Sequence, residues 1–472
     1  MSVGRRMSRV EWRNGCGSTI LPRLFSIFLL LPPLSLRAQS GALDKSFNPG
    51  TGVDQSVYAI VVQTNGSILI AGNFTSFNTA PRTNIARLYP GGSGDTGFDS
   101  GPASSGSFPY VNALGLQADG MVLLGGSFTN AAATNLARLN TNGTLDTSFT
   151  SQADDTVNAL VVQTNGSVVI GGFFTHVNGR AQTAIARLGA NGVLDLSFNL
   201  SLSGGFATVY ALALQPDGEI VLGGSFTNVN STARTNIARL LADGTLDANF
   251  KPVSVGGGQL SPAAIYALAV DGQGRVLAGG DFTSVNGLVR TNLVRLNGDG
   301  SLDTNFYAAA GTDFAVNSLA VQSDDKVLMG GYFNLVNGVS RNYIARLNAD
   351  GTLDTTFDPG SGASDVVYSV ALQSDGKVLI GGAFTDFDGT ARNGIARLIM
   401  PGPQLVNPVL SNNVFKVSVD TVNGKNYTLE YKNSLADSDW TALPVVPGDG
   451  TVKTLMDSSA TDPRRFYRVE VQ

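Results

Sequence analysis

The sequence predicts an all-β chain: a seven-bladed β-propeller closed by an N-terminal strand, followed by a small, sandwich-like all-β domain. A strand–turn–strand stretch, of which residues 373–385 are one copy, recurs seven times at a spacing of 46 to 56 residues. Its Asp-Gly pair between apolar runs is typical of a two-residue type I′ hairpin turn. The acidic residues are 32 Asp and only 4 Glu, which argues against much helix because Asp favours turns.

Residues 1–40 are predicted to be a secretory signal peptide. Arginines precede an apolar run of 13 residues, Leu24 to Leu36, which is shorter than the roughly 20 residues that span a bilayer. Ala38-Gln39-Ser40 then supplies a small-x-small cleavage site. The alternative interpretation is a buried core segment. We therefore expect a secreted or cell-surface protein with no transmembrane segment in its mature chain.

Without the leader, the chain has 25 basic and 35 acidic residues, and no basic cluster. Nucleic acid is therefore not an expected partner. The single cysteine, Cys16, leaves with the leader, which excludes disulfides, thiol chemistry and cysteine–zinc sites in the mature protein.

Three signatures alternate along residues 41–400. A Gly-Gly-x-Phe-like unit ends at Phe74, Phe128, Phe174, Phe226, Phe282, Phe333 and Phe384. An Ile-Ala-Arg-Leu-like unit has its arginine at Arg87, Arg138, Arg187, Arg239, Arg295, Arg346 and Arg397. A Leu-Asp-x-x-Phe-like unit has its aspartate at Asp44, Asp95, Asp146, Asp195, Asp247, Asp303 and Asp354.

Each repeat can hold four short strands, which is typical of a propeller blade. In the last repeat these are Tyr368 to Gln373, Lys377 to Phe384, Gly394 to Leu398, and the Leu-Asp-x-x-Phe unit. That unit occurs first at Leu43 to Phe47 and is missing after Leu398. The N-terminal strand can therefore complete the seventh blade. An open β-solenoid is the alternative, but it would have no use for this offset.

The combination Gly-Gly-x-Phe-Thr-x-Val-Asn-Gly, Arg-x-x-Ile-Ala-Arg-Leu-Asn and Asp-Gly-Thr-Leu-Asp-x-x-Phe resembles the delta-60 repeat β-propeller of bacterial secreted and surface proteins. The resemblance covers residues 43–400. Repeat two departs most, with the short loop 129–135, and repeat one has Gly94-Asp95-Thr96-Gly97-Phe98 as its last unit. The family implies a propeller fold but no defined activity, so it supplies no catalytic residue and no cofactor.

After a linker at 401–403, residues 404–472 are predicted to form a second, small all-β domain. Phe415 to Val419, Tyr427 to Tyr431, Val452 to Met456 and Phe466 to Val471 alternate like strands, and Trp440 is expected to anchor the core. The pattern is similar to C-terminal modules on exported proteins of planctomycete- or verrucomicrobia-like bacteria.

Several residue patterns that could carry chemistry have a structural interpretation. His176, the only histidine, could serve a Ser-His-Asp triad but is better explained as a loop residue. The paired glycines could suggest a phosphate-binding loop, but no helix follows them to hold a phosphate. They are instead expected to let neighbouring blades approach closely or to mark a bulge. The aspartates and arginines present in all seven repeats fit a turn-capping Asp paired with an Arg. Asn297 to Asp303 lacks the ligand spacing of a calcium loop and reads as a hairpin. We therefore expect no metal site and no cofactor.

The candidate ligand-binding residues lie at variable connections, which an up-and-down blade places on one face of the ring. Five arginines precede the third strand: Arg82, Arg234, Arg290, Arg341 and Arg392. They could receive an acidic polymer or carboxylate, or pair with loop aspartates. Four tyrosines start the first strand, Tyr58, Tyr210, Tyr266 and Tyr368, and either rim the central opening or pack between blades.

We therefore predict an exported, non-catalytic propeller, expected to be a monomer, that binds a protein or glycan through the variable-loop face. The alternative is an extracellular enzyme resembling a polysaccharide lyase, glycosidase or lactonase, with an Asp-based site at the channel mouth. A propeller fold permits both. The scarcity of histidine and glutamate favours binding.

The leader prediction is tested by expression with the native N-terminus in a Gram-negative host. Protein recovered outside the cytoplasm should start near Gly41, as measured by intact mass and N-terminal sequencing. Exported protein that retains Met1 would contradict a cleaved signal peptide.

Overall fold

The computed structural model describes residues 40–99, 105–129, 133–258, 262–306, 311–400, 405–421, 425–434, 437–448, 451–460 and 465–471. They form two compact units, one within residues 40–400 and the other within 405–471, and each is treated separately here. The predicted signal peptide, apart from Ser40, and the linker at 401–403 lie outside the described residues. Every named element of the described part is a strand, and none of it is a helix that could cross a membrane.

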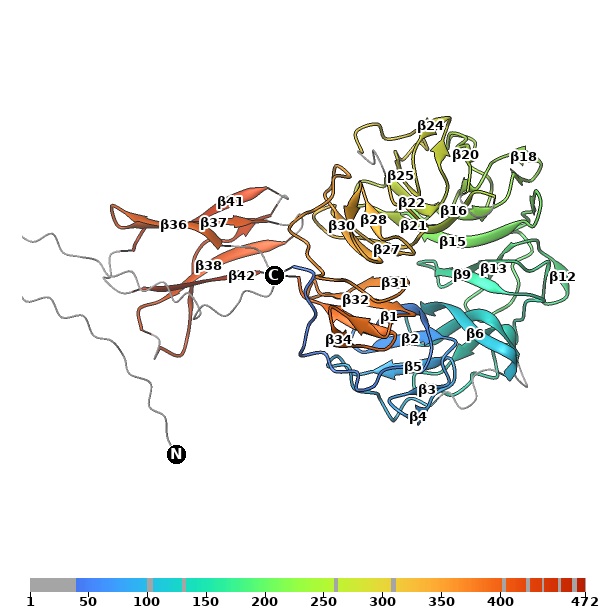
Figure 1. Ribbon diagram of the computed structural model, residues 1–472, viewed down its shortest axis with the longest axis horizontal. Helices are drawn as coiled ribbons and strands as arrows, with labels where there is room; N and C mark the ends of the chain where they lie inside the picture. Colours follow the sequence, from blue (N-terminus) through green and yellow to red (C-terminus); the bar gives the residue numbers. More distant parts are fainter. Residues whose placement is uncertain are drawn as a thin grey trace, which may run out of the picture. The chain divides into compact units, whose positions relative to one another are not determined.

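The first unit is the predicted seven-bladed propeller, and each blade is a three-stranded antiparallel sheet (Figure 1). The innermost strands are β1 (Val57–Val62), β6 (Ser105–Leu116), β9 (Val157–Val162), β15 (Thr208–Leu214), β21 (Ala264–Val270), β26 (Val316–Val321) and β31 (Val367–Leu372). The middle strands are β2 (Ile68–Gly72), β7 (Val122–Thr129), β10 (Val168–Gly172), β16 (Ile220–Ser225), β22 (Val276–Asp281), β27 (Val327–Gly331) and β32 (Val378–Gly382). The outer strands are β5 (Ile85–Leu88), β8 (Thr134–Leu139), β13 (Ile185–Leu188), β19 (Ile237–Leu240), β25 (Leu293–Leu296), β30 (Ile344–Leu347) and β35 (Ile395–Leu398).

Short hairpins, which the sequence did not predict as strands, join middle to outer strands in six blades. They are β3 (Ser76–Phe77) with β4 (Ala80–Pro81), β11 (His176–Val177) with β12 (Arg180–Ala181), β17 (Asn228–Val229) with β18 (Thr232–Ala233), β23 (Ser284–Val285) with β24 (Leu288–Val289), β28 (Leu335–Val336) with β29 (Val339–Ser340), and β33 (Asp386–Phe387) with β34 (Thr390–Ala391). In blades 4 and 5 a further strand pairs with the hairpin, β14 (Leu202–Ser203) and β20 (Val255–Gly256).

The blades follow one another around a ring, and the seventh lies beside the first. Figure 1 shows β31 and β32 next to β1 and β2, and each innermost strand adjoins the next around the circle. The core lies between blades: Leu379 and Ile395 of blade 7 share one buried cluster with Val57 and Ile68 of blade 1. Each blade therefore buries its apolar face only against its neighbours.

The paired glycines serve this close packing, as the sequence predicted. A Cβ on Gly381 would lie 2.7 Å from Cγ1 of Val57 in the next blade. A Cβ on Gly382 would lie 2.1 Å from the carbonyl oxygen of Val366, beside the bulge of β31. The first glycine admits the neighbouring blade and the second admits the strand beside it.

The prediction of type I′ turns is wrong. In blade 7, only Gly376 of the Asp-Gly pair has positive φ, at 83°. Its N–H donates to the carbonyl of Gln373 at 2.9 Å, and the N–H of Gln373 donates to the carbonyl of Lys377. This is a three-residue loop in which a turn is completed by a glycine in the left-handed conformation. The side chain of Asp375 accepts the N–H of Lys377, which stabilises this form.

The predicted fourth strand is also wrong, because the Leu-Asp-x-x-Phe unit forms one bridge and then a turn. Leu353, for example, bridges Leu347 of β30, and the N–H of Phe357 then donates to the carbonyl of Asp354. Oδ1 of Asp354 accepts the N–H of Thr356, as expected of a turn-capping aspartate. Local hydrogen bonds to the aspartate therefore take the place of the backbone hydrogen bonds that a fourth strand would make with its neighbour.

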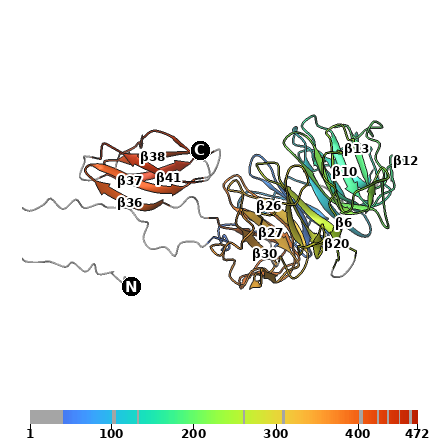
Figure 2. The ribbon, with the colours of Figure 1, turned by 90° about the horizontal axis from the view of Figure 1, so that it is seen from above.

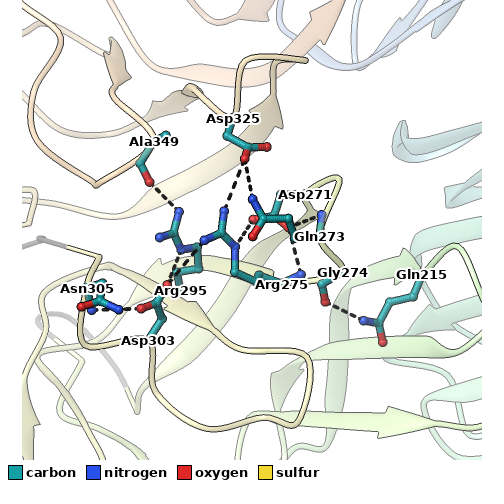
Figure 3. A network of polar contacts seen from close by, with 10 residues as sticks. All are labelled: Gln215, Asp271, Gln273, Gly274, Arg275, Arg295, Asp303, Asn305, Asp325 and Ala349. Carbon is teal, nitrogen blue, oxygen red and sulfur yellow. Dashed lines mark hydrogen bonds and ion pairs between the residues drawn. The ribbon is translucent and has the colours of Figure 1, made fainter. Parts of the chain in front are cut away.

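An arginine clamp joins this unit to the rest of its blade and to the next blade. In blade 5, Nε of Arg295 donates to Oδ2 of Asp303 at 2.8 Å, and the guanidinium lies over the ring of Phe306 at 4.5 Å. Nη1 of Arg295 donates to the carbonyl of Ala349 in blade 6 at 2.6 Å (Figure 3). The predicted Asp–Arg pairing is thus confirmed. The same pairing occurs in all seven blades, as Arg87–Asp95, Arg138–Asp146, Arg187–Asp195, Arg239–Asp247, Arg295–Asp303, Arg346–Asp354 and Arg397–Asp44.

Residues 41–47 supply this unit to blade 7 from the N-terminal end of the propeller. The N–H of Asp44 donates to the carbonyl of Arg397, and the N–H of Ile399 donates to the carbonyl of Ala42, both at 2.8 Å. Arg397 pairs with Asp44, lies over Phe47 and donates to the carbonyl of Pro90 in blade 1. These contacts attach the N-terminal segment to β35. Whether ring closure depends on them stays a prediction.

The second unit contains two antiparallel sheets (Figure 2). Their buried side chains form one core. One holds β36 (Leu405–Ser411), β37 (Val414–Asp420) and β41 (Val452–Asp457), and the other holds β38 (Asn426–Lys432), β39 (Thr441–Ala442), β40 (Val446–Pro447) and β42 (Phe466–Val471). The four strands predicted here are present. The prediction for Trp440 is wrong: it is half-exposed between Lys432 and Arg468, whereas Tyr427 is the largest side chain in the core.

Substituting Phe47 tests the contribution of the N-terminal segment. Phe47 is fully buried, so Phe47→Ala should lower the free energy of unfolding by about 3–5 kcal/mol. A chain that starts at Thr51 should also be less soluble than one that starts at Gly41, because the missing segment leaves the edge of β35 exposed. Chemical denaturation measures the first effect, with Phe206→Ala as the control because that side chain is 83% exposed. Unchanged stability would contradict closure by this segment.

The clamp aspartates should make stability depend on acid. Burial alone would raise the pKa of Asp354, but hydrogen bonds from Thr356 and Lys326 and the charge of Arg346 lower it to about 2. An unfolded Asp titrates near 3.9. The ionised form therefore stabilises the fold above about pH 4, and this stabilisation is lost as the pH falls through about 2. Urea unfolding should show Asp354→Asn far less stable than wild type at pH 6 and closer to it at pH 2.5. An equal difference at both pH values would contradict this assignment.

Candidate ligand-binding surface

The two ends of the propeller differ in their loops. At one end, short uniform turns such as 373–377 join innermost to middle strands. The other end, here called the loop face, carries the six hairpins and the connections between successive blades. The connections from the Phe of the Leu-Asp-x-x-Phe unit to the next innermost strand also vary in length there, from Phe98–Ser105 to Phe250–Ala264. Variable loops on a rigid scaffold are where binding sites concentrate.

The five predicted arginines lie on this face, each directly after the second strand of a hairpin or its equivalent. Their Nη1 atoms donate to the carbonyl of the preceding residue at 2.8 to 3.0 Å. Within the described residues none of the five forms an ion pair, so the pairing with loop aspartates is not observed. Nη2 of Arg392 reaches the carbonyl of Phe47 at 3.5 Å, which places this guanidinium at the outer unit of its blade, away from the channel.

The four predicted tyrosines occupy one structural position. Each innermost strand contains a β-bulge that leaves one residue unpaired, and the bulges fall at Tyr58, Asn112, Asn158, Tyr210, Tyr266, Asn317 and Tyr368. Bulges re-aim a side chain out of the alternation of a strand. All seven residues, here called the bulge ring, are Tyr or Asn, and all are half-buried.

Members of the bulge ring contact one another between neighbouring blades. The rings of Tyr58 and Tyr368 lie 5.2 Å apart, and those of Tyr210 and Tyr266 lie 5.3 Å apart. Nδ2 of Asn112 donates to Oδ1 of Asn158 at 3.1 Å. Burial raises the pKa of Tyr58 and Tyr368 above its usual value near 10, so both hydroxyls stay neutral. The ring therefore offers neutral hydrogen-bonding groups and aromatic surface, without an acid or base that titrates near pH 7.

Two pairs of exposed aromatic side chains lie beside the bulges on the loop face. Phe173 and Phe206, from blades 3 and 4, have ring centres 6.2 Å apart. Phe314 and Tyr332 of blade 6 have ring centres 6.1 Å apart. The N–H of Tyr332 donates to the carbonyl of Ala315, two residues before the bulge at Asn317. Exposed aromatic side chains that gather in pairs indicate an interaction site.

Blade 6 also carries an unusual backbone position next to this pair. Tyr343 has a positive φ of 64°, where the corresponding residues are Asn84, Asn135, Ala184, Asn236, Asn292 and Gly394. Its N–H donates to the carbonyl of Phe333, and its carbonyl accepts the N–H of Gly331, which precedes Tyr332. A bulky residue in this conformation costs energy and is a pointer to function.

The remaining chemical candidates are structural. Nδ1 of His176 contacts both Asp154 and Thr175, at 3.1 and 2.9 Å, whereas a catalytic triad uses both ring nitrogens. In the calcium-like loop, Asp299 caps Ser301 and pairs with Lys251, and Asp303 belongs to the clamp. The residues that the structure describes contain no cluster of three or more His, Cys, Asp or Glu that could hold a metal ion.

Sequence reasoning missed the three asparagines of the bulge ring and the exposed aromatic pairs. Each of these asparagines follows a Val, and the tyrosines of the other repeats follow a Val or, before Tyr266, Ile265. Alignment on that β-branched residue, rather than on the type of the residue after it, would have found the asparagines. The aromatic pairs join residues 18 or 33 positions apart, and no local pattern relates them.

The sequence matches the family described as "Domain of unknown function (DUF5122) beta-propeller" seven times. The matched residues are 63–98, 117–149, 163–198, 215–250, 274–306, 322–357 and 373–398, which together make half of the chain. Each match runs from the turn after an innermost strand to the outer part of the same blade. None of the curated proteins matches the sequence.

Solved structures similar to this chain include a Staphylococcus aureus virginiamycin B lyase with quinupristin, which is 12% identical with a TM-score of 0.45 over 75% of this chain and 98% of that one. A gluconolactonase from Xanthomonas campestris is 11% identical with a TM-score of 0.36, covering 76% and 100%. Saccharomyces cerevisiae Sqt1 is 13% identical with a TM-score of 0.39, covering 81% and 96%. Likenesses this distant say nothing about activity.

Proposed function

We propose that this chain, which belongs to the β-propeller family of unknown function DUF5122, is an exported, non-catalytic binding module whose loop face recognises a glycan. The observation that carries the proposal is the bulge ring, in which all seven positions hold Tyr or Asn. The ring is neutral, so it suits a neutral ligand rich in hydroxyl groups. Asparagine amides both donate and accept hydrogen bonds, as sugar hydroxyls require.

The exposed aromatic pairs complete such a surface. Tyr332 is 52% exposed and Phe206 is 83% exposed, so a ligand at the channel mouth could bury both. Flat aromatic rings pack against the apolar faces of sugar rings at low conformational cost. A protein ligand would also use aromatic anchors, but it would favour an apolar centre with a polar rim. Here the polar asparagines are at the centre. Export rests on the predicted leader and on the weak similarity of the second domain to modules of exported proteins.

Binding is tested with the full chain on a panel of soluble polysaccharides, by affinity electrophoresis followed by calorimetry on the best ligand. Tyr332→Ala and Phe314→Ala should each weaken binding about ten-fold, the loss of roughly 1.4 kcal/mol of stacking and burial. Tyr89→Ala is the matched control, since Tyr89 is a similarly exposed tyrosine in a turn at the opposite end of the propeller.

Three results would overturn the proposal. Binding that is unaffected by both loop-face substitutions would place the glycan elsewhere. Release of reducing ends or unsaturated products from a bound polysaccharide would show an enzyme. No binding to any polysaccharide, together with saturable binding of a protein blocked by Tyr332→Ala, would assign the loop face to a protein ligand.

A further inference from the structure

A groove at the outer edge of the propeller is formed by blades 2 and 3, apart from the bulge ring. This open groove has a volume of about 500 Å³, within the range of small-ligand sites. Blade 2 contributes Ser148 and Thr150 after its clamp aspartate. Blade 3 contributes Asn178 and Arg180 from the hairpin of β11 and β12, and residues 191–194 and Leu196 from the turn after β13.

The residues of this groove depart from what the repeat requires. Where blade 3 has Val193, other blades have Ser93, Thr144, Thr245, Ser301 and Thr352. Four of those hydroxyls donate to the Asn or Asp two residues earlier, a bond that Val193 cannot make. Where blade 3 has Leu196, four of the others have Thr, and none has a large apolar residue. Where it has Arg180, the hairpins of other blades have Ala80, Thr232, Leu288, Val339 and Thr390.

These departures bring no evident gain to the fold. Val193 and Leu196 are 63% and 65% exposed, so neither is part of the buried core. Within the described residues the Arg180 side chain makes no hydrogen bond or ion pair, and it is exposed. A repeat protein shares its structural needs among all blades. Residues that occur in one blade, lie together in one groove and stay exposed are therefore available to a ligand.

We infer that this groove binds a peptide segment in which an aliphatic side chain lies close to a carboxylate. Val193, Leu194 and Leu196 offer apolar surface for the aliphatic side chain. The guanidinium of Arg180 matches a carboxylate. Oγ of Ser148 donates to Oδ1 of Asp146, and Oδ1 of Asn191 accepts the N–H of Val193. The Thr150 hydroxyl, Nδ2 of Asn191 and the acceptor side of the Ser148 hydroxyl remain to hydrogen-bond peptide N–H and C=O groups, which an acyl chain could not supply.

This site is independent of the glycan site. Its test is selection of a phage-displayed library of random 12-residue peptides on the full chain, after depletion on the triple variant Arg180→Thr/Val193→Thr/Leu196→Thr. Each substitution installs a residue that another blade carries at that position, so the variant should keep the wild-type unfolding midpoint. Enriched peptides should place Asp, Glu or the C-terminus within three residues of Leu, Ile or Val.

The best peptide, synthesised and titrated by calorimetry, should bind wild type roughly ten-fold or more tightly than the triple variant. Arg180→Thr alone should abolish the preference for the acidic peptide over its Asn-substituted form. Leu288→Thr, which removes a comparably exposed leucine from blade 5, should leave the affinity unchanged. No enrichment over the triple variant, enrichment of basic peptides, or equal affinity for both proteins would overturn the inference. Saturable binding of octanoate at the groove without peptide enrichment would assign it to an acyl chain instead.

Discussion

One contact recurs in every blade of the ring, and the arginine of the outer strand makes it. Its Nε holds the turn-capping aspartate, its guanidinium plane covers the phenylalanine of the same unit, and in six blades its Nη1 reaches a backbone carbonyl of the next blade. Blade 6 is the exception, because blade 7 has no turn after its outer strand and Arg346 contacts the sulfur of Met400 instead. The planar, fixed geometry of the guanidinium allows all three contacts at once, which lysine could not do.

The seven clamps and the glycine contacts serve the fold, so the residues that make them are structural. Residues outside these contacts are the ones available to bind a ligand. The arginines and aspartates that recur most strongly are used within and between blades. The bulge ring differs in kind, since all blades share the position but some hold Tyr there and others Asn. Blade 5 shows the same freedom at its inner turn. There Asp271 replaces the glutamine of the other blades and pairs with Arg275, which also contacts Asp325 of blade 6 (Figure 3).

Much of the fold could be predicted because the sequence contains seven copies of one structural unit, and a feature present in all of them is not accidental. Blade number, strand order, the Asp–Arg pair and the role of the glycines follow from that redundancy. The turn type could not, because Asp-Gly fits both a two-residue and a three-residue loop, and only the φ of the aspartate decides. Trp440 was misplaced for a related reason: a single tryptophan in an unrepeated domain gives no pattern, and Lys432 and Arg468 hold it at the surface. The tyrosines were found by residue type, whereas their setting at bulges needed the strand register.

The two proposed sites lie at different distances from the axis of the ring, one at the channel and one at the outer edge, and the fold constrains them differently. A closed ring brings one position of every blade together at the channel, so a site there can use a shared position with modest changes of side chain. At the outer edge only two adjacent blades meet, so a binding site there requires residues that differ from those of the other blades at the same positions. Val193, Leu196 and Arg180 are residues of this kind, and Tyr343, directly before the outer strand of blade 6, is another. In a repeat protein without established activity, the residues that the fold does not need are thus the ones to substitute first.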